Sequence, residues 1–148
     1  MMKIISLLIF SASYLLSGGF WTLTGVTKAN IYVVNQISYL DPQTIILSKQ
    51  KMNDILLKNG IKTQAQDSPT LMLELQDIED DETHYIYIKL ALGEEVQTFR
   101  KNQDKTFALT YQGTDFIDVD RTEIDNEVLE SVDFLLSQFI EQFEDDKD

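Results

Sequence analysis

The only histidine of this chain follows a run of acidic residues. His84 comes after five carboxylate residues, Asp77, Glu79, Asp80, Asp81 and Glu82. Imidazole and carboxylate groups can bind zinc or nickel, and a histidine can act as a general base. Zinc usually takes three or four protein ligands on rigid elements, and the EF-hand spacing with its glycine is absent. The segment is therefore predicted to be a solvated turn between two strands. A weak calcium contact and a catalytic role are the alternatives.

A second acidic segment, TDFIDVDRTEID, spans residues 114–125. In an extended segment Asp118 and Asp120 share one face, and paired carboxylates suit a hard cation or glycoside hydrolysis. The favoured interpretation is that Asp120 or Thr122 caps a helix by accepting hydrogen bonds from the amides of its first turn. The alternative is a calcium- or metal-dependent protein or hydrolase. Its candidate ligands are Asp115, Asp118, Asp120 and Glu123.

Other catalytic chemistries lack the residues that they need. The chain has no cysteine, which excludes disulfides, zinc–thiolate sites, thiol catalysis, iron–sulfur ligation and lipid attachment to an amino-terminal cysteine. The sequence contains no G-x-S-x-G nucleophile motif and neither of the glycine-rich phosphate-binding motifs. No catalytic residue and no cofactor are therefore expected.

The charge of the chain limits its partners. Its 148 residues include 25 acidic and 12 basic side chains, for a formal net charge of −13. A chain this acidic repels nucleic-acid phosphate and anionic lipid headgroups, so no nucleic-acid partner is expected. The charge favours solubility, and it can also attract a basic partner or weakly capture divalent cations.

Residues 1–19 have the order of a secretion signal. Lys3 supplies the positive start, residues 4–16 are mainly apolar, and Ser17, Gly18 and Gly19 are small. This pattern predicts export to the periplasm or surface of a bacterial cell, with cleavage after Gly19 or as late as Ala29. Because residues 15–26 stay fairly apolar, a retained membrane anchor and a buried helix remain open as alternatives.

The rest of the chain predicts a single α+β domain over residues 29–143. A linker is expected at 20–28 and an acidic, fraying tail at 144–148. Residues 29–36 favour a strand, and a helix starts at Pro42 with Asp41 as N-cap and ends at Gly60. Alternating apolar residues predict strands at 70–78, 84–93 and 105–113, with Phe107, Leu109 and Tyr111 on one face of the last. A helical stripe from near Thr122 to Phe143 predicts a final helix.

This order, β-α-β-β-β-α, predicts a two-layer sandwich, a mostly antiparallel sheet with both helices on one face. Tyr85, Tyr87 and Lys89 would then lie on the open face and are the candidate partner-binding residues. Tyr85, Tyr87 and Phe99, with Tyr111 near, could form an exposed aromatic patch. The alternative, that these aromatics pack beneath the helices, is favoured because half of each alternating strand must face the core.

These features predict a non-catalytic exported accessory or adaptor domain that binds another envelope protein through the open face or an edge strand. In its element order, the chain is similar to the amino-terminal domain of the propeller protein of the Tol envelope system. A membrane-anchored subunit of an envelope complex is the remaining alternative, if the amino-terminal segment is not cleaved.

Overall fold

The structure, a computed structural model, describes residues 22–67, 69–119 and 123–147. Its elements follow in the predicted order: β1 (Asn30–Asn35), α2 (Pro42–Lys58), β2 (Thr70–Glu79), β3 (His84–Gln97), β4 (Lys105–Ile117) and α3 (Ile124–Asp145). The α+β class and the element order are therefore confirmed. The predicted signal segment, residues 1–19, lies outside the described residues.

The strands form one mixed sheet in the order β1-β2-β3-β4. β1 runs parallel to β2, whereas the β2–β3 and β3–β4 pairs are antiparallel. A parallel pair needs a long crossover connection, and α2 provides it between β1 and β2. The short connections of the two antiparallel pairs are hairpins.

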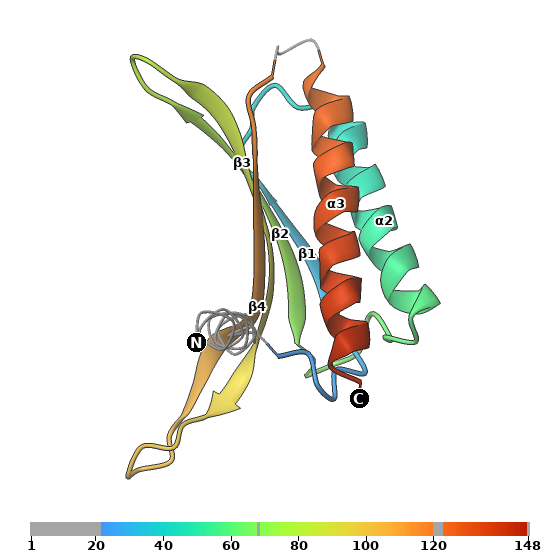
Figure 1. The fold of residues 1–148 in the computed structure, drawn as a ribbon, viewed down its shortest axis with the longest axis vertical. Helices are drawn as coiled ribbons and strands as arrows, with labels where there is room; N and C mark the ends of the chain where they lie inside the picture. Colours follow the sequence, from blue (N-terminus) through green and yellow to red (C-terminus); the bar gives the residue numbers. More distant parts are fainter. Residues whose placement is uncertain (1–21, 68, 120–122, 148) are drawn as a thin grey trace, which may run out of the picture.

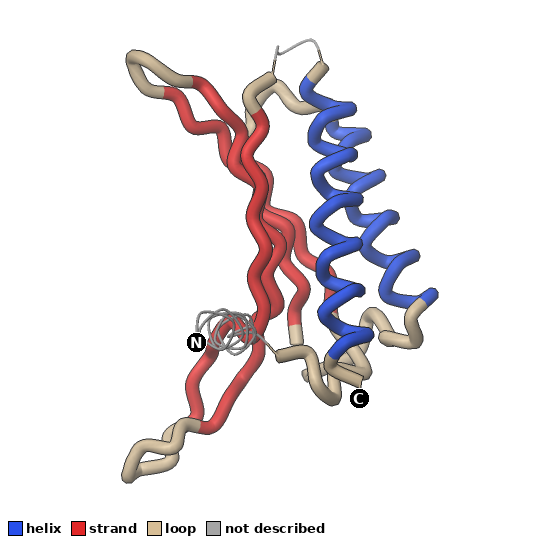
Figure 2. Tube along the Cα trace, in the orientation of Figure 1, coloured by secondary structure: helices blue, strands red, loops and turns tan. Residues whose placement is uncertain are grey.

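Both helices cover the same face of the sheet, and the described residues leave the other face open (Figure 1). The tube in Figure 2 shows that the far ends of the two hairpins bend away from the helices. The open face is therefore concave along its length. The domain is a sandwich of one helix layer and one sheet layer.

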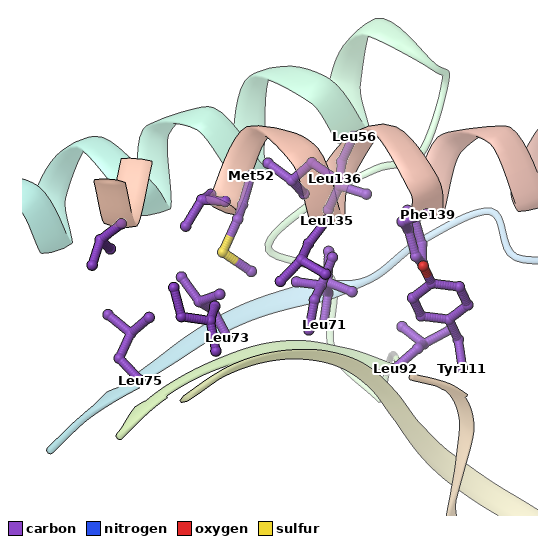
Figure 3. Packing of buried hydrophobic residues seen from close by; sticks show 14 of the residues in the cluster. Met52, Leu56, Leu71, Leu73, Leu75, Leu92, Tyr111, Leu135, Leu136 and Phe139 are labelled. Carbon is purple, nitrogen blue, oxygen red and sulfur yellow. The ribbon is translucent and has the colours of Figure 1, made fainter. Parts of the chain in front are cut away.

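The core lies between the sheet and the helices. Strand residues of period two meet helix residues of period three or four, which is the pattern that the sequence predicted. Tyr111 of β4 packs edge-on against Phe139 of α3, with ring centroids 5.0 Å apart. Figure 3 shows this packing, to which the central strands and the helices contribute Leu71, Leu73, Leu75, Leu92, Met52, Leu56, Leu135, Leu136 and Phe139.

The ends of α2 follow the sequence signals. The Asp41 side chain accepts a hydrogen bond from the Gln43 amide at 2.9 Å, and Pro42 occupies the first helical position. Asn59 is the C-cap residue, and Gly60 follows it with φ at +78°. Glycine adopts this left-handed conformation without the steric penalty of a Cβ atom.

The helix α3 begins at Ile124, close to the predicted start near Thr122. Glu123 is the N-cap residue, and its side chain makes no capping hydrogen bond. Asp120 and Thr122, the expected capping residues, lie outside the described residues. Instead, Asp125 in the first turn of α3 bonds to α2. Its Oδ1 accepts from the Asp41 amide at 3.0 Å and from the Thr44 hydroxyl.

Residues 144–147, which were predicted to form a fraying tail, make several contacts with the domain. The helix α3 continues to Asp145. The Asp146 carboxylate then accepts from the Leu23 amide at 2.6 Å and from the Gln142 side chain at 2.8 Å. Lys147 lies over the Phe143 ring, with its Nζ atom 4.6 Å from the centroid. These contacts fix the end of the helix because they satisfy polar groups beside the core.

The predicted linker packs on the domain over its described part, residues 22–28. Leu23 is only 1% exposed and belongs to the core cluster. The Thr22 amide donates to the Thr110 carbonyl of β4 at 3.0 Å. The backbone of Lys28 forms an isolated parallel β-bridge with that of Lys62. Because a large side chain of this segment is buried in the core and its backbone bonds to the sheet, residues 22–28 are part of the domain.

The pairing of β3 and β4 shifts register between Leu92 and Gly93, at the end of the strand predicted at 84–93. The shift separates side chains that the sequence placed on one face. Tyr111 is buried, but Phe107 is exposed and lies over Gly93, so close that its ring would meet a Cβ atom there. The prediction that Phe107 and Tyr111 share a face was wrong, because a bulge reverses the alternation of side chains.

Burial raises the pKa of Tyr111 to about 12, from the ordinary value of 10.0 for a tyrosine. The folded protein thus favours the protonated phenol, so this stabilisation is complete below about pH 10 and is lost as pH rises to about 12. We expect Tyr111→Phe to weaken the alkaline loss of stability, measured by urea unfolding at pH values from about 9 to about 12. The matched control is Tyr32→Phe, at an exposed tyrosine. Identical pH profiles for the two variants would contradict the expectation.

Candidate functional site

His84 lies at the start of the strand that the sequence predicted at 84–93, beside the solvated turn rather than within it. It is the first residue of β3, and its Nε2 atom lies 2.6 Å from Asp77 Oδ1 and 3.2 Å from the Tyr39 hydroxyl. The His84 and Asp77 side chains are 27% and 19% exposed. The sequence did not predict this contact, because it depends on the antiparallel pairing of β2 and β3, which brings Asp77 next to His84.

The Tyr39–His84–Asp77 group has the geometry of a structural contact. The space bounded by Tyr39, His84 and Val119 is too small for a water-sized molecule. A general base needs a substrate proton within hydrogen-bond reach, and this enclosed side of His84 cannot admit one. The group instead fastens the connection after β1 to the start of β3.

The turn between β2 and β3 is held by hydrogen bonds to Asp80 and is exposed to solvent, as predicted. Its Oδ1 accepts from the Glu82 amide at 2.9 Å and from the Thr83 amide at 2.7 Å. Backbone donation from Glu82, then from Thr83, lowers the pKa of Asp80 below its ordinary value. Asp80, Asp81 and Glu82 are exposed.

The predicted metal ligands come only partly together. Asp115 is engaged within the fold, where it accepts from the Ser131 hydroxyl at 2.7 Å and from the Phe116 amide at 2.9 Å. Asp118 and Glu123 are exposed, and Asp120 lies outside the described residues. In the ranges that the structure describes, no three histidine or acidic side chains are grouped to hold a metal ion.

Asp115, Asp118 and Glu123 nevertheless share one open groove between the end of β4 and the first half of α3. Its volume is about 510 Å³. We call it the acidic groove. Its lining residues are Asp115, Phe116, Ile117, Asp118, Val119, Glu123, Glu127, Glu130, Ser131 and Phe134.

Aromatic side chains gather on the open face beside this groove. Tyr85 and Tyr87 alternate with the buried residues Ile86 and Ile88, so they lie on the face away from the helices. Both contact Phe116 of β4, with ring centroids 5.7 Å and 5.3 Å away. We call Tyr85, Tyr87 and Phe116 the aromatic cluster. The favoured prediction that these tyrosines pack beneath the helices was wrong.

Sequence reasoning missed Phe116, which is 62% exposed. Phe116 lies within the acidic segment 114–125, in which only the carboxylates were considered as site residues. Its place follows from the alternation of Asp115, Phe116 and Ile117, in which Ile117 is buried. Tyr32 of β1 was also missed, although its pairing with Met72 puts it on the open face and it is exposed.

Other proposed members of the site lie elsewhere or are already paired. Tyr111 faces the core, and Phe99 is fully exposed in the connection between β3 and β4. Lys89 does lie on the open face, where it forms an ion pair of 2.5 Å with Glu74, its cross-strand neighbour. In this pair the charge of Lys89 is offset by that of Glu74.

No protein-family model matches the chain, and no curated protein is significantly similar to it. Within residues 22–67, 69–119 and 123–147, neither helix is both long and apolar enough to cross a membrane.

Proposed function

We propose that this chain is a non-catalytic, exported accessory or adaptor domain that binds another protein of the cell envelope. The observation that supports this proposal is the aromatic cluster on the open, concave face of the sheet. Both helices cover the opposite face, so the described residues leave this face available to a partner.

Physical chemistry favours the aromatic cluster as the centre of an interface. Aromatic side chains are enriched in protein interfaces, where they account for much of the binding energy. Phe116 already contacts Tyr85 and Tyr87 in the free protein. The rings therefore lose little conformational freedom when a partner covers them.

The export part of the proposal is supported by the sequence. Residues 1–19 have the pattern of a secretion signal. Mass measurement of the protein isolated from the source cells tests this part directly. We expect a mature chain that begins at Phe20, and a mass that includes residues 1–19 would contradict cleavage.

Site-specific photo-cross-linking tests the binding face. A photoreactive phenylalanine analogue at position 116 should give a discrete cross-linked product in cells. The same analogue at position 46 should not, because Ile46 is exposed on α2, in the helix layer. Equal cross-linking at the two positions would contradict the proposal.

A paired substitution tests whether the aromatic cluster stabilises the complex. We expect Tyr87→Ser with Phe116→Ser to abolish cross-linking from an analogue at position 85. The fold should lose only about 1 kcal/mol, because the rings are partly exposed and their mutual contacts are weak. The control is Ile46→Ser, which should leave cross-linking unchanged. Full cross-linking in the doubly substituted protein would assign the binding face elsewhere.

A further inference from the structure

The outer edge of β4 has backbone groups that face away from β3. Two contacts identify them: the Thr110 carbonyl accepts from the Thr22 amide, and the Phe116 amide donates to Asp115 Oδ1. Alternate residues of a strand direct their backbone groups to the same side. Gln112 and Thr114, between these two positions, therefore also present their amide and carbonyl groups outward.

This edge is long enough for a short added strand. Among the described residues β4 is the last strand of the sheet, and Thr22 of the amino-terminal segment reaches it at Thr110. From Gln112 to Phe116 the edge extends for roughly 17 Å, at about 3.4 Å per residue. An exposed edge of this kind is a template for another extended chain.

The two sides of the edge differ in chemistry. On the helix side lies the acidic groove, whose carboxylates are Asp115, Asp118, Glu123, Glu127 and Glu130. No lysine or arginine is among the described residues that line it. On the other side lies the aromatic cluster, with Phe116 at the edge itself.

We infer that β4 binds an extended segment of the partner in which basic and apolar residues alternate. This inference rests on the proposed function, because it names the chemistry of that partner. Side chains of an added strand point alternately to the two faces of the sheet. Lysine or arginine side chains enter the acidic groove, and the apolar side chains between them pack against Phe116 and Tyr87.

Charge distinguishes this occupant from the two that the chain itself could supply. A second copy would bring its own acidic groove and a formal net charge of −13, so like charges would face each other across the edge. Residues 1–19 contain one basic residue, Lys3, so they cannot supply alternating basic side chains. A basic segment from another protein fits both faces of the edge.

Labelled synthetic peptides and the full-length protein test the inference by fluorescence anisotropy. The probe is a short peptide in which lysine and valine alternate. Its first control has the same composition with the lysines and valines in separate blocks. We expect the alternating peptide to bind at least about tenfold more tightly than the block peptide. Equal affinities would overturn the inference, because they would mean that only net charge attracts the peptide.

Backbone methylation tests whether the peptide adds as a strand. Two versions of the alternating peptide carry N-methyl groups on its even or on its odd residues. Only one set of amides faces β4, so one version should lose at least about tenfold in affinity and the other should bind nearly as well as the parent. Equal affinities for both versions would exclude strand addition.

A matched pair of variants tests the acidic groove. Glu127→Gln with Glu130→Gln should weaken binding of the alternating peptide at least about tenfold. Asp54→Asn with Glu141→Gln removes the same charge from exposed positions outside the groove and should have little effect. Equal losses in both pairs would overturn the assignment of the groove.

Two further outcomes separate this inference from the proposed function. Sedimentation that shows a stable dimer of this chain, dissociated by the alternating peptide, would assign the edge to a second copy and overturn the inference. If the peptide fails to bind while position 116 still cross-links to a discrete partner, the proposed function stands and the basic-strand inference fails.

Discussion

Replacing Phe139 by alanine is expected to lower the free energy of unfolding by about 3–5 kcal/mol. Phe139 is fully buried in the second half of α3 and packs edge-on against Tyr111. The substitution removes a large apolar side chain and leaves a cavity between the helix layer and the sheet. The cavity cannot collapse easily, because residues on both layers are held by their own elements.

Chemical denaturation with urea gives this quantity directly. The matched control is Phe99→Ala, since Phe99 is fully exposed in the connection between β3 and β4. It should change the free energy of unfolding by no more than about 0.5 kcal/mol. A loss below about 1 kcal/mol for Phe139→Ala would mean that α3 does not pack on the sheet as described.

Local signals explain why the fold could be predicted from the sequence. The start of α2 needs only Asp41 and Pro42, which act on the amides of the same turn. The strand β2 needs only its alternating leucines, and the stripe on α3 marks one buried face. Each of these signals involves residues close together in the chain, and each held in the structure.

The errors concern contacts between residues that are distant in sequence. Leu23 packs into the core cluster and its amide donates to Asp146, and nothing near either residue in the sequence indicates this pairing. The shift at Gly93 depends on how β3 and β4 align, so it moved Phe107 away from the face of Tyr111. The local composition of residues 20–28 and 144–148 predicts exposed, flexible segments. Their contacts depend on residues that are distant in sequence and are brought close only by folding.

The candidate site follows the same division. The alternation of β3 placed Tyr85 and Tyr87 on one common face, but it did not decide whether that face is open or covered by the helices. Phe116 could not be joined to them, because that contact needs the register of β4 against β3. In the acidic segment at 114–125 the sequence indicated only the carboxylates as candidate site residues. The structure shows that its exposed phenylalanine, Phe116, completes the aromatic cluster.

The layered fold separates stability from binding. The core lies on the helix side of the sheet, while the aromatic cluster and the outer edge of β4 lie outside it. Substitutions at Phe116 or Glu127 thus leave most of the buried apolar surface in place. A binding defect in such variants can be assigned to the surface itself, provided that their unfolding free energies match those of the controls.

Replacing Leu23 by alanine is expected to lower the free energy of unfolding by about 2–5 kcal/mol. Leu23 is buried and belongs to the core cluster, although it lies only a few residues after the predicted signal segment. The substitution keeps the backbone amide that donates to Asp146, so it measures packing alone. Ile46→Ala, at an exposed position of α2, is the matched control.

This result bears on where the amino-terminal segment can be cleaved. Cleavage after Gly19 leaves Leu23 in the mature protein, whereas cleavage after Ala29 removes it together with the amide that Ala29 donates to the Lys62 carbonyl. We therefore expect a chain that begins at Phe20 to unfold at a higher urea concentration than a chain that begins at Asn30, with a difference at least as large as that of Leu23→Ala. Equal midpoints would show that residues 20–29 do not stabilise the fold, and cleavage at the later position would then be compatible with a stable domain.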